Sequence, residues 1–185
     1  DLLTLVQSFD GLVVVDEAYI DFSTQDSLIG ELSNYPNLII TQTLSKAYGM
    51  AGIRLGICIA SEEIIAILNK IKPPYNINTL TQERAIDSLK NQESTQTQIK
   101  QLMDERDRLY EQLQGVSFVE KVNPSDANFL LVRVDDAGKR YAQLIENDIV
   151  VRNRSQQYGC ENCLRFSVGT ADENKILIQT LNRLS

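Results

Sequence analysis

The sequence contains no histidine, and only three of its 185 residues are cysteine. The absence of histidine excludes the Ser-His and Cys-His nucleophile systems, histidine metal sites and an imidazole general base. Any catalysis must therefore depend on Lys, Asp, Glu, Tyr or Cys, or on a cofactor. An odd number of cysteines does not make a disulfide framework, so we expect a reduced, cytoplasmic setting.

The cysteines also make a poor metal site. Cys160 and Cys163 form a CxxC pair, but the chain has neither a second pair nor a histidine to complete four zinc ligands. We expect no metal, and we interpret the pair as two incidental thiols near the start of a strand.

Positive charge is scarce as well, because 18 Lys and Arg against 25 Asp and Glu give a net charge of −7. A nucleic-acid or anionic-membrane binder needs a basic face, so we expect neither partner, although a local cationic pocket remains possible. No apolar run approaches the ~20 residues that cross a bilayer. The acidic start of the chain does not resemble a secretory signal.

Short apolar runs alternate with segments of helical spacing in the first part of the chain. Runs typical of strands buried on both faces cover residues 12–15, 38–41 and 57–60. Helical spacing covers residues 1–9, 28–32 and 61–71, with Ser61 as the N-cap of the last segment. This alternation predicts an α/β fold with a parallel sheet.

The second part of the chain changes character. Residues 78–113 predict one or two long helices that Gly115 ends. Strands are then expected at residues 116–122, 129–134, 149–151 and 164–168, and helices at 138–147 and 172–184. We expect part of a large parallel-sheet domain over residues 1–77, a helical connection over 78–114 and a small α+β domain over 115–185.

Chemistry-bearing residues follow two of the predicted strands. Asp16 ends the first strand, and Lys46 follows the second with Thr43 and Ser45 beside it. Ligands of open α/β sheets bind outside the carboxyl ends of strands. Arg54 follows two glycines, so the set resembles an anion site, although it is not a Walker A loop. Considered alone, Asp16 could equally be a helix cap or a solvated acid, and Lys46 a surface lysine.

Two segments of this region resemble the fold-type-I aminotransferases that use pyridoxal phosphate. SKAYGMAGIRLG, residues 45–56, is similar to the family's lysine signature, and VVVDEAYIDF, residues 13–22, to the segment that holds the cofactor's pyridine nitrogen. DEAYIDF and CLRFSVGT are most similar to the histidinol-phosphate aminotransferases. The resemblance covers essentially the whole chain, but only the C-terminal half of such an enzyme.

The resemblance implies a role for each of these residues toward the cofactor. Lys46 is expected to bind the aldehyde of pyridoxal phosphate as a Schiff base and later to transfer a proton. Asp16 is expected to keep the pyridine nitrogen protonated, and the phenol of Tyr19 to bond the ring oxygen. The expected phosphate ligands are Ser45 and Arg54, with Thr43 as a weaker candidate.

Two arginines near the end of the chain are expected to bind substrate. Arg165 lies within a predicted strand, and by resemblance it binds the acid group of the substrate. Arg152 matches a second arginine associated with the substrate phosphate, and its neighbour Arg154 is the residue that could be confused with it. The alternative for Arg152 and Arg165 is a surface salt bridge within the small domain.

The activity implied by the resemblance is transamination of histidinol phosphate with 2-oxoglutarate, giving imidazole-acetol phosphate and glutamate, in histidine biosynthesis. The expected partners are a phosphorylated amino alcohol, a 2-oxo acid and a second subunit of a homodimer. One alternative is a pyridoxal-phosphate decarboxylase of a phosphorylated amino acid. The other is a non-catalytic C-terminal fragment that acts in binding or assembly.

The family's N-terminal half carries further cofactor contacts, namely a stacking aromatic, an asparagine and a phosphate-binding loop. A tyrosine from the partner subunit completes the site. None of these precedes Asp1 in this sequence. We therefore expect the full-length parent to be the enzyme and the 185-residue chain to be incomplete by itself.

Overall fold

The computed structural model of the protein describes residues 2–185. The chain divides into two compact units, Asp1–Gln96 and Thr97–Ser185, each with its own sheet. Helix α4 (Gln92–Gln114) carries the chain from the first unit into the second. Asp1, the first residue of the helix expected over 1–9, lies outside the described residues.

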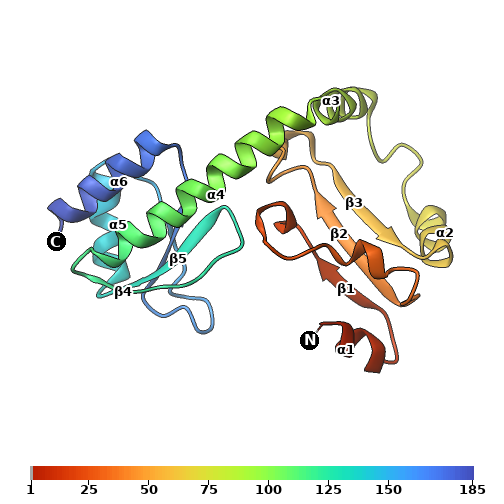
Figure 1. Cartoon of the computed structure of the whole chain (residues 1–185), viewed down its shortest axis with the longest axis horizontal. Helices are drawn as coiled ribbons and strands as arrows, with labels where there is room; N and C mark the ends of the chain where they lie inside the picture. Colours follow the sequence, from red (N-terminus) through yellow and green to blue (C-terminus); the bar gives the residue numbers. More distant parts are fainter. Residues whose placement is uncertain (1) are drawn as a thin grey trace. The chain divides into compact units, whose positions relative to one another are not determined.

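The first unit is built on a three-stranded sheet in the order β1-β2-β3. The strands, side by side in Figure 1, are β1 (Val13–Asp16), β2 (Leu38–Thr43) and β3 (Gly56–Ala60). Strands β1 and β2 are parallel, whereas β3 runs antiparallel to β2. The predicted α/β class is confirmed, but the sheet is mixed. The loop over residues 44–55 folds back on itself without a crossover helix, so β3 returns antiparallel.

Helices surround this sheet incompletely. The elements are α1 (Leu2–Ser8), α2 (Glu62–Ile71), α3 (Thr79–Leu89) and the 3₁₀ turns Ile20–Phe22, Leu28–Glu31 and Ala51–Ile53. The helix expected over residues 28–32 is therefore only one 3₁₀ turn, which begins at the Ser27 cap. Ser61 stands at the predicted N-cap of α2, but its side chain makes no capping hydrogen bond there.

Strand β1 is buried on one face, not on both as predicted. Val13 and Val15 pack against Val6 of α1 and the buried residues of β2. On the other face, Val14 remains 59% exposed. Because α1 and the 3₁₀ segments cover one face of the strand, alternate residues of β1 stay accessible.

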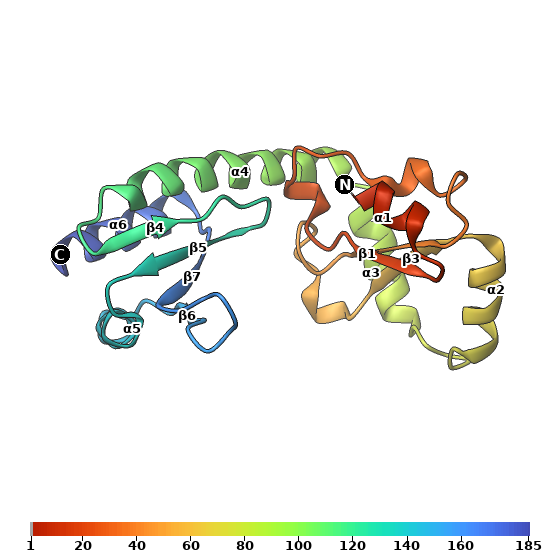
Figure 2. The ribbon, with the colours of Figure 1, turned by 90° about the horizontal axis from the view of Figure 1, so that it is seen from below.

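The second unit is a four-stranded antiparallel sheet in the order β4-β5-β7-β6. Its elements are β4 (Val119–Val122), β5 (Phe129–Val134), β6 (Arg152–Asn153), β7 (Cys163–Ser167), α5 (Ala137–Glu146) and α6 (Ala171–Arg183). Figures 1 and 2 show α4 and α6 running side by side. The predicted small α+β unit is confirmed, although the strand expected at 149–151 lies at Arg152–Asn153.

The core of this unit lies between one face of the sheet and its three helices. Residues alternate along β5, so Leu130, Val132 and Val134 are buried and the residues between them are half-buried. The buried strand residues form one cluster with residues of α4, α5 and α6. The opposite face of β5 and β7 therefore remains available to a ligand.

Candidate functional site

The carboxyl ends of the parallel strands β1 and β2 lie at one edge of the first sheet. Asp16, the exposed last residue of β1, is opposite Thr41 of β2. Its Oδ1 accepts hydrogen bonds from the Ala18 N–H at 3.1 Å and the Thr41 hydroxyl at 3.2 Å. Within residues 2–185, its other oxygen has no hydrogen-bond partner, so the oriented carboxylate can accept from a ligand.

A residue that the sequence did not single out, Glu17, stabilises this edge. Its side chain is buried, at 7% exposure, and accepts hydrogen bonds from three neutral donors. These donors are the Ser27 hydroxyl at 2.6 Å, the Leu28 N–H at 2.8 Å and the Gln42 amide at 2.9 Å. Glu17 thus links the end of β1, the segment after Tyr19 and strand β2. The one signal for Glu17 in the sequence was the position of an acidic residue at the end of a predicted strand.

The loop over residues 44–55 carries the predicted lysine and rests on helix α3. Leu44 and Met50 are buried against Ala85 of α3. The Thr81 hydroxyl of the same helix donates to the Ile53 carbonyl at 3.3 Å. The ends of the loop are joined by a hydrogen bond from the Leu44 N–H to the Leu55 carbonyl at 3.4 Å. Packing against α3 therefore fixes the part of the loop that presents Lys46.

Lys46 and Tyr19, 27 positions apart in the sequence, come together at this edge. The exposed Lys46 amine lies 5.3 Å from the centroid of the Tyr19 ring, within cation–π range. Within residues 2–185, neither Lys46 nor Asp16 forms an ion pair. A charged amine, a phenol and a carboxylate are thus positioned by one sheet edge and its loops.

The hydroxyl of Thr43 is engaged within the loop. It accepts a hydrogen bond from the Ser45 N–H at 3.1 Å and donates to the Leu55 carbonyl at 3.4 Å. The Ser45 hydroxyl makes no hydrogen bond to residues 2–185. Thr43 therefore shapes the turn before Lys46, whereas the hydroxyl of Ser45 can bind a ligand.

Arg54 follows the turn in a left-handed backbone conformation, with a φ of 55°. Its Nη1 donates to the Ala51 carbonyl at 3.0 Å, and the guanidinium has no acidic partner within the described chain. Gly49, at a φ of 63°, provides the other left-handed position of this loop. The loop therefore presents an exposed cation without a counter-charge, which suits an anionic ligand.

Two titratable groups beside the loop have raised pKa values. Burial raises the pKa of the Tyr48 phenol, and the negative charge of Asp21 raises it further. Burial also raises the pKa of the Asp21 carboxyl. The phenol two residues after Lys46 is therefore held protonated near neutral pH.

The second sheet places the two predicted substrate arginines directly opposite each other. Arg152 of β6 is the cross-strand partner of Arg165 of β7. Arg154 is not in this pair, and its N–H donates to the Cys163 carbonyl at 2.8 Å. Like charges on opposed residues destabilise a sheet. An anion bound between the two guanidinium groups would offset this repulsion.

The donor set of the first unit fits pyridoxal phosphate. An amine for the aldehyde is present in Lys46, and a carboxylate for the pyridine nitrogen in Asp16. Ser45 and Arg54 provide a hydroxyl and a guanidinium for a phosphate, and Tyr19 provides a phenol. The uncompensated charges of Asp16 and Arg54 match a ligand that has a basic nitrogen at one end and an anion at the other.

Residues 2–185 offer no comparable set of ligands for a metal ion. In the described chain, no group of three or more His, Cys, Asp or Glu side chains could hold a metal ion. Cys160 and Cys163 are both free thiols.

Among the helices of residues 2–185, none is long and apolar enough to cross a membrane.

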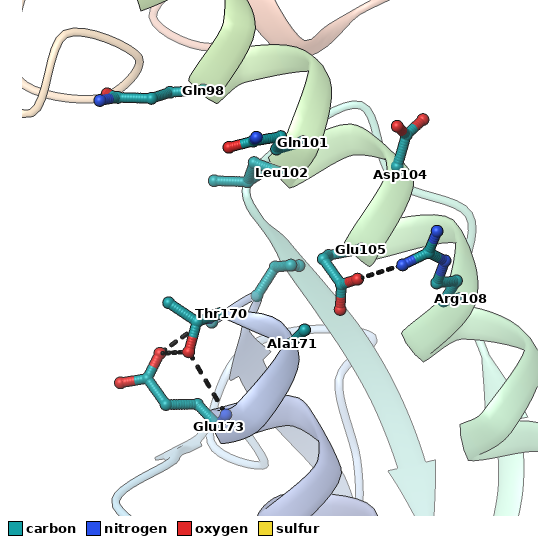
Figure 3. A pocket seen from close by; sticks show the side chains of 11 residues that line it. Gln98, Gln101, Leu102, Asp104, Glu105, Arg108, Thr170, Ala171 and Glu173 are labelled. Carbon is teal, nitrogen blue, oxygen red and sulfur yellow. Dashed lines mark hydrogen bonds and ion pairs between the residues drawn. The ribbon is translucent and has the colours of Figure 1, made fainter.

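The second unit contains a cavity that none of the predicted site residues lines. It has a volume of about 590 Å³ and lies between α4 and the start of α6 (Figure 3). Glu105 reaches into it and accepts hydrogen bonds from Arg108 at 2.6 Å and from Asn174 at 3.1 Å. Thr170 and Glu173 bond each other at the α6 terminus. Glu105 and Glu173 are thus engaged in hydrogen bonds with residues of α4 and of the α6 N-terminus.

Comparisons with known proteins agree with this geometry. Residues 1–181 match the family model described as aminotransferase class I and II. The chain is 58% identical over 184 residues, 100% of its length, to a histidinol-phosphate aminotransferase of Flavobacterium johnsoniae, of which it covers 53%. It spans about half the length of the curated relatives that it matches.

Two solved structures are also similar to this chain in fold. The histidinol-phosphate aminotransferase from Clostridium acetobutylicum is 30% identical with a TM-score of 0.91, and the match covers 99% of this chain and 57% of that one. A decarboxylase from Sulfurospirillum multivorans is 29% identical with a TM-score of 0.86, over 99% of this chain and 56% of that one.

Proposed function

The chain belongs to the class I and II aminotransferase family, and on this premise we propose that it is the lysine-bearing part of a histidinol-phosphate aminotransferase. The proposed reaction transfers an amino group between histidinol phosphate and 2-oxoglutarate with pyridoxal phosphate as cofactor. The observation that carries the proposal is the 58% identity to a histidinol-phosphate aminotransferase over 100% of this chain.

Each residue of the sheet edge has a task in this reaction. Pyridoxal phosphate, when bound, supplies an electron sink for the carbon from which a proton is removed. Lys46 would hold the cofactor through its aldehyde, and its amine would be the group that removes and returns the proton at the substrate carbon. Asp16 holds the proton on the ring nitrogen with its free carboxylate oxygen, and Tyr19 orients the ring oxygen.

The remaining residues are proposed to bind the anionic groups of the cofactor and of the substrate. Ser45 and Arg54 bind the cofactor phosphate, and Thr43 supports them through its bonds within the loop. Arg165 and Arg152, opposed on β7 and β6, bind the anionic end of the substrate. Histidinol phosphate and glutamate both carry an anionic group close to the carbon that bears the amine, a phosphate in one and a carboxylate in the other, so one pair of arginines serves both half-reactions.

A decarboxylase of a phosphorylated amino acid is the second candidate, because a decarboxylase fold matches this chain with a TM-score of 0.86. It requires the same lysine and aspartate. The discriminating assay offers the full-length protein histidinol phosphate with 2-oxoglutarate in one vessel and a phosphorylated amino acid in another. Glutamate formation supports the aminotransferase, and release of carbon dioxide without glutamate rejects it.

The lysine assignment has its own test. Borohydride reduction of the full-length protein loaded with pyridoxal phosphate, followed by peptide mapping, is expected to label Lys46. A label on Lys70 or Lys72 instead would reject the assignment. The same preparation, compared with the 185-residue chain by visible absorption, tests whether the chain alone binds the cofactor weakly, as we propose.

We extend the proposal to the setting of the whole protein. We propose that it is a homodimer in the cytoplasm, where the reducing setting suits the three free cysteines. Light scattering of the full-length protein, at concentrations used for the assay, measures the dimer directly.

A further inference from the structure

The guanidinium of Arg165 has an aromatic ring beside it instead of a carboxylate. Its Cζ lies 4.8 Å from the ring centroid of Phe129. Within residues 2–185, Arg165 forms no ion pair, and its buried Nε has no hydrogen-bond partner. A buried N–H without an acceptor costs free energy. The other N–H groups of this half-buried guanidinium make no hydrogen bond within residues 2–185, and a carboxylate or phosphate oxygen is an acceptor that fits them.

The strand register brings the ring and the guanidinium together. Leu131 of β5 is opposite Arg165 of β7, and Phe129 is opposite Ser167. Phe129 is therefore a diagonal neighbour of Arg165 on the same face, a separation that aromatic and long side chains can span. On the other side of β7, Arg152 is directly opposite Arg165. Arg165 thus has a ring on one neighbouring strand and a second cation on the other.

A second arginine of the same unit provides a contrast. Arg140 also lies over a ring, with its Cζ 3.8 Å from the centroid of Phe118. Its donors, however, are occupied by Asp135, with Nε to Oδ1 at 2.9 Å and Nη2 to Oδ2 at 2.8 Å, and by the Leu184 carbonyl at 2.7 Å. The ring of Phe118 therefore lies under a guanidinium whose N–H donors are already bound within the protein. The ring of Phe129 lies under a guanidinium whose N–H donors are still available to a ligand.

An aromatic ring and a carboxylate orient a guanidinium with different consequences. A carboxylate neutralises the charge and occupies the donors that an anionic ligand needs. A ring attracts the guanidinium through its face and restricts its rotation, yet leaves the N–H groups at the edge open. Restricting the side chain before binding reduces the entropy lost when the ligand arrives.

From this arrangement we infer that Phe129 is a positioning residue, which holds the Arg165 guanidinium ready for the carboxylate or phosphate of the substrate. The inference rests on the proposed function, in which Arg165 binds the anionic end of the substrate. Phe129 acts through Arg165 and not on the cofactor, so its loss affects substrate binding and not the chemical step.

The test uses the full-length protein and the variants F129L, F129Y, R165A and the double variant F129L/R165A. We expect F129L to raise KM for histidinol phosphate about fivefold, as the loss of one cation–π contact implies, with kcat within about twofold of the wild type. F129Y keeps the ring and is expected to restore KM to within about twofold. F118L, which removes the ring beneath the saturated Arg140, is the matched control and is expected to leave KM unchanged.

The variants separate failure of this inference from failure of the proposed function. An unchanged KM in R165A rejects the substrate role of Arg165 and, with it, the role of Phe129. A raised KM in R165A with an unchanged KM in F129L rejects only the positioning role. If F129L raises KM equally with and without Arg165, Phe129 is merely structural and the inference is wrong. Should F129L fail to fold, as judged by its melting temperature, F129M replaces it under the same criteria.

Discussion

At the scale of single residues, the hydrogen bonds of Asp16 separate a structural role from a chemical one. Both described donors, Ala18 N–H and the Thr41 hydroxyl, bond the same oxygen, Oδ1. An asparagine keeps that oxygen and both bonds but lacks the negative charge. We expect D16N in the full-length protein to lower kcat for transamination by about 100-fold or more. A steady-state assay beside a thermal melt measures both effects, and near-normal turnover would show that Asp16 is only structural.

The ion pair of Asp135 with Arg140 predicts a pH dependence of stability. The Arg140 hydrogen bonds lower the pKa of Asp135 from 3.8 to about 2. A pKa lowered in the folded state stabilises the protein above the unfolded value, and this stabilisation is lost as the pH falls from about 4 to about 2. Asp135 is 44% exposed, so solvent screening limits the contribution to roughly 1 kcal/mol.

The measurement compares melting temperatures of the wild type and D135N across this range. We expect D135N to be less stable at pH 7, and the difference between the two proteins to shrink below pH 4. The control is D126N at the same pH values, because Asp126 is exposed and forms no ion pair within residues 2–185. A difference that stays constant down to pH 2 would contradict the ion-pair interpretation.

At the scale of elements, helix α6 depends on a reciprocal cap at its N-terminus. The Thr170 hydroxyl accepts from the Glu173 N–H at 3.3 Å, and Glu173 accepts from the Thr170 N–H at 2.8 Å (Figure 3). The hydrogen bonds that the Thr170 N–H and hydroxyl donate to the carboxylate lower the pKa of Glu173. We expect T170A to lower the free energy of unfolding by about 1 kcal/mol, and T170S to retain most of it. Urea unfolding measures both, and equal losses in the two variants would argue against the cap.

Elements whose signals are local were predictable from the sequence, and those that depend on distant partners were not. Strand β5 begins and ends where it was predicted, at Phe129–Val134. The direction of β3 was missed, because it is set by the folding back of the loop after β2 and not by the residues of β3. The segment at 28–32 has helical spacing, but only one 3₁₀ turn forms there.

The residues of the candidate site also fall into two groups, those that local sequence signals predicted and those that depend on distant partners. Asp16 and Lys46 were found from their positions after two strands, and the register places both strand ends at one edge. Glu17 was missed because its role depends on Ser27 and Gln42, which are 10 and 25 residues away. Phe129 was missed for the same reason, since its partner Arg165 lies on another strand.

At the scale of the whole molecule, the two units have cores of unequal extent. In the second unit, buried residues of the sheet and of α4, α5 and α6 form one continuous cluster. The first unit has two small clusters of buried apolar residues, one around Leu38 and Ile40 and the other around Leu44 and Met50, and the buried Phe22 and Ile39 belong to neither. Stability of local regions follows the density of buried apolar contacts, so the units are expected to open at different free energies.

Hydrogen exchange followed by mass spectrometry tests this difference. We expect the amides of β5 and β7 to exchange most slowly and those of β1 and β3 to exchange faster.

Leu164 is fully buried in the second core, so L164A is expected to lower the free energy of unfolding of that unit by about 3 kcal/mol and to accelerate exchange in β5 and β7. Exchange in β1 and β2 should stay unchanged in L164A. V14A, at a 59% exposed position of β1, is the matched control and should leave both patterns as they are. Equal acceleration in both units of L164A would show that the chain opens as one cooperative body, and the division by core size would then be wrong.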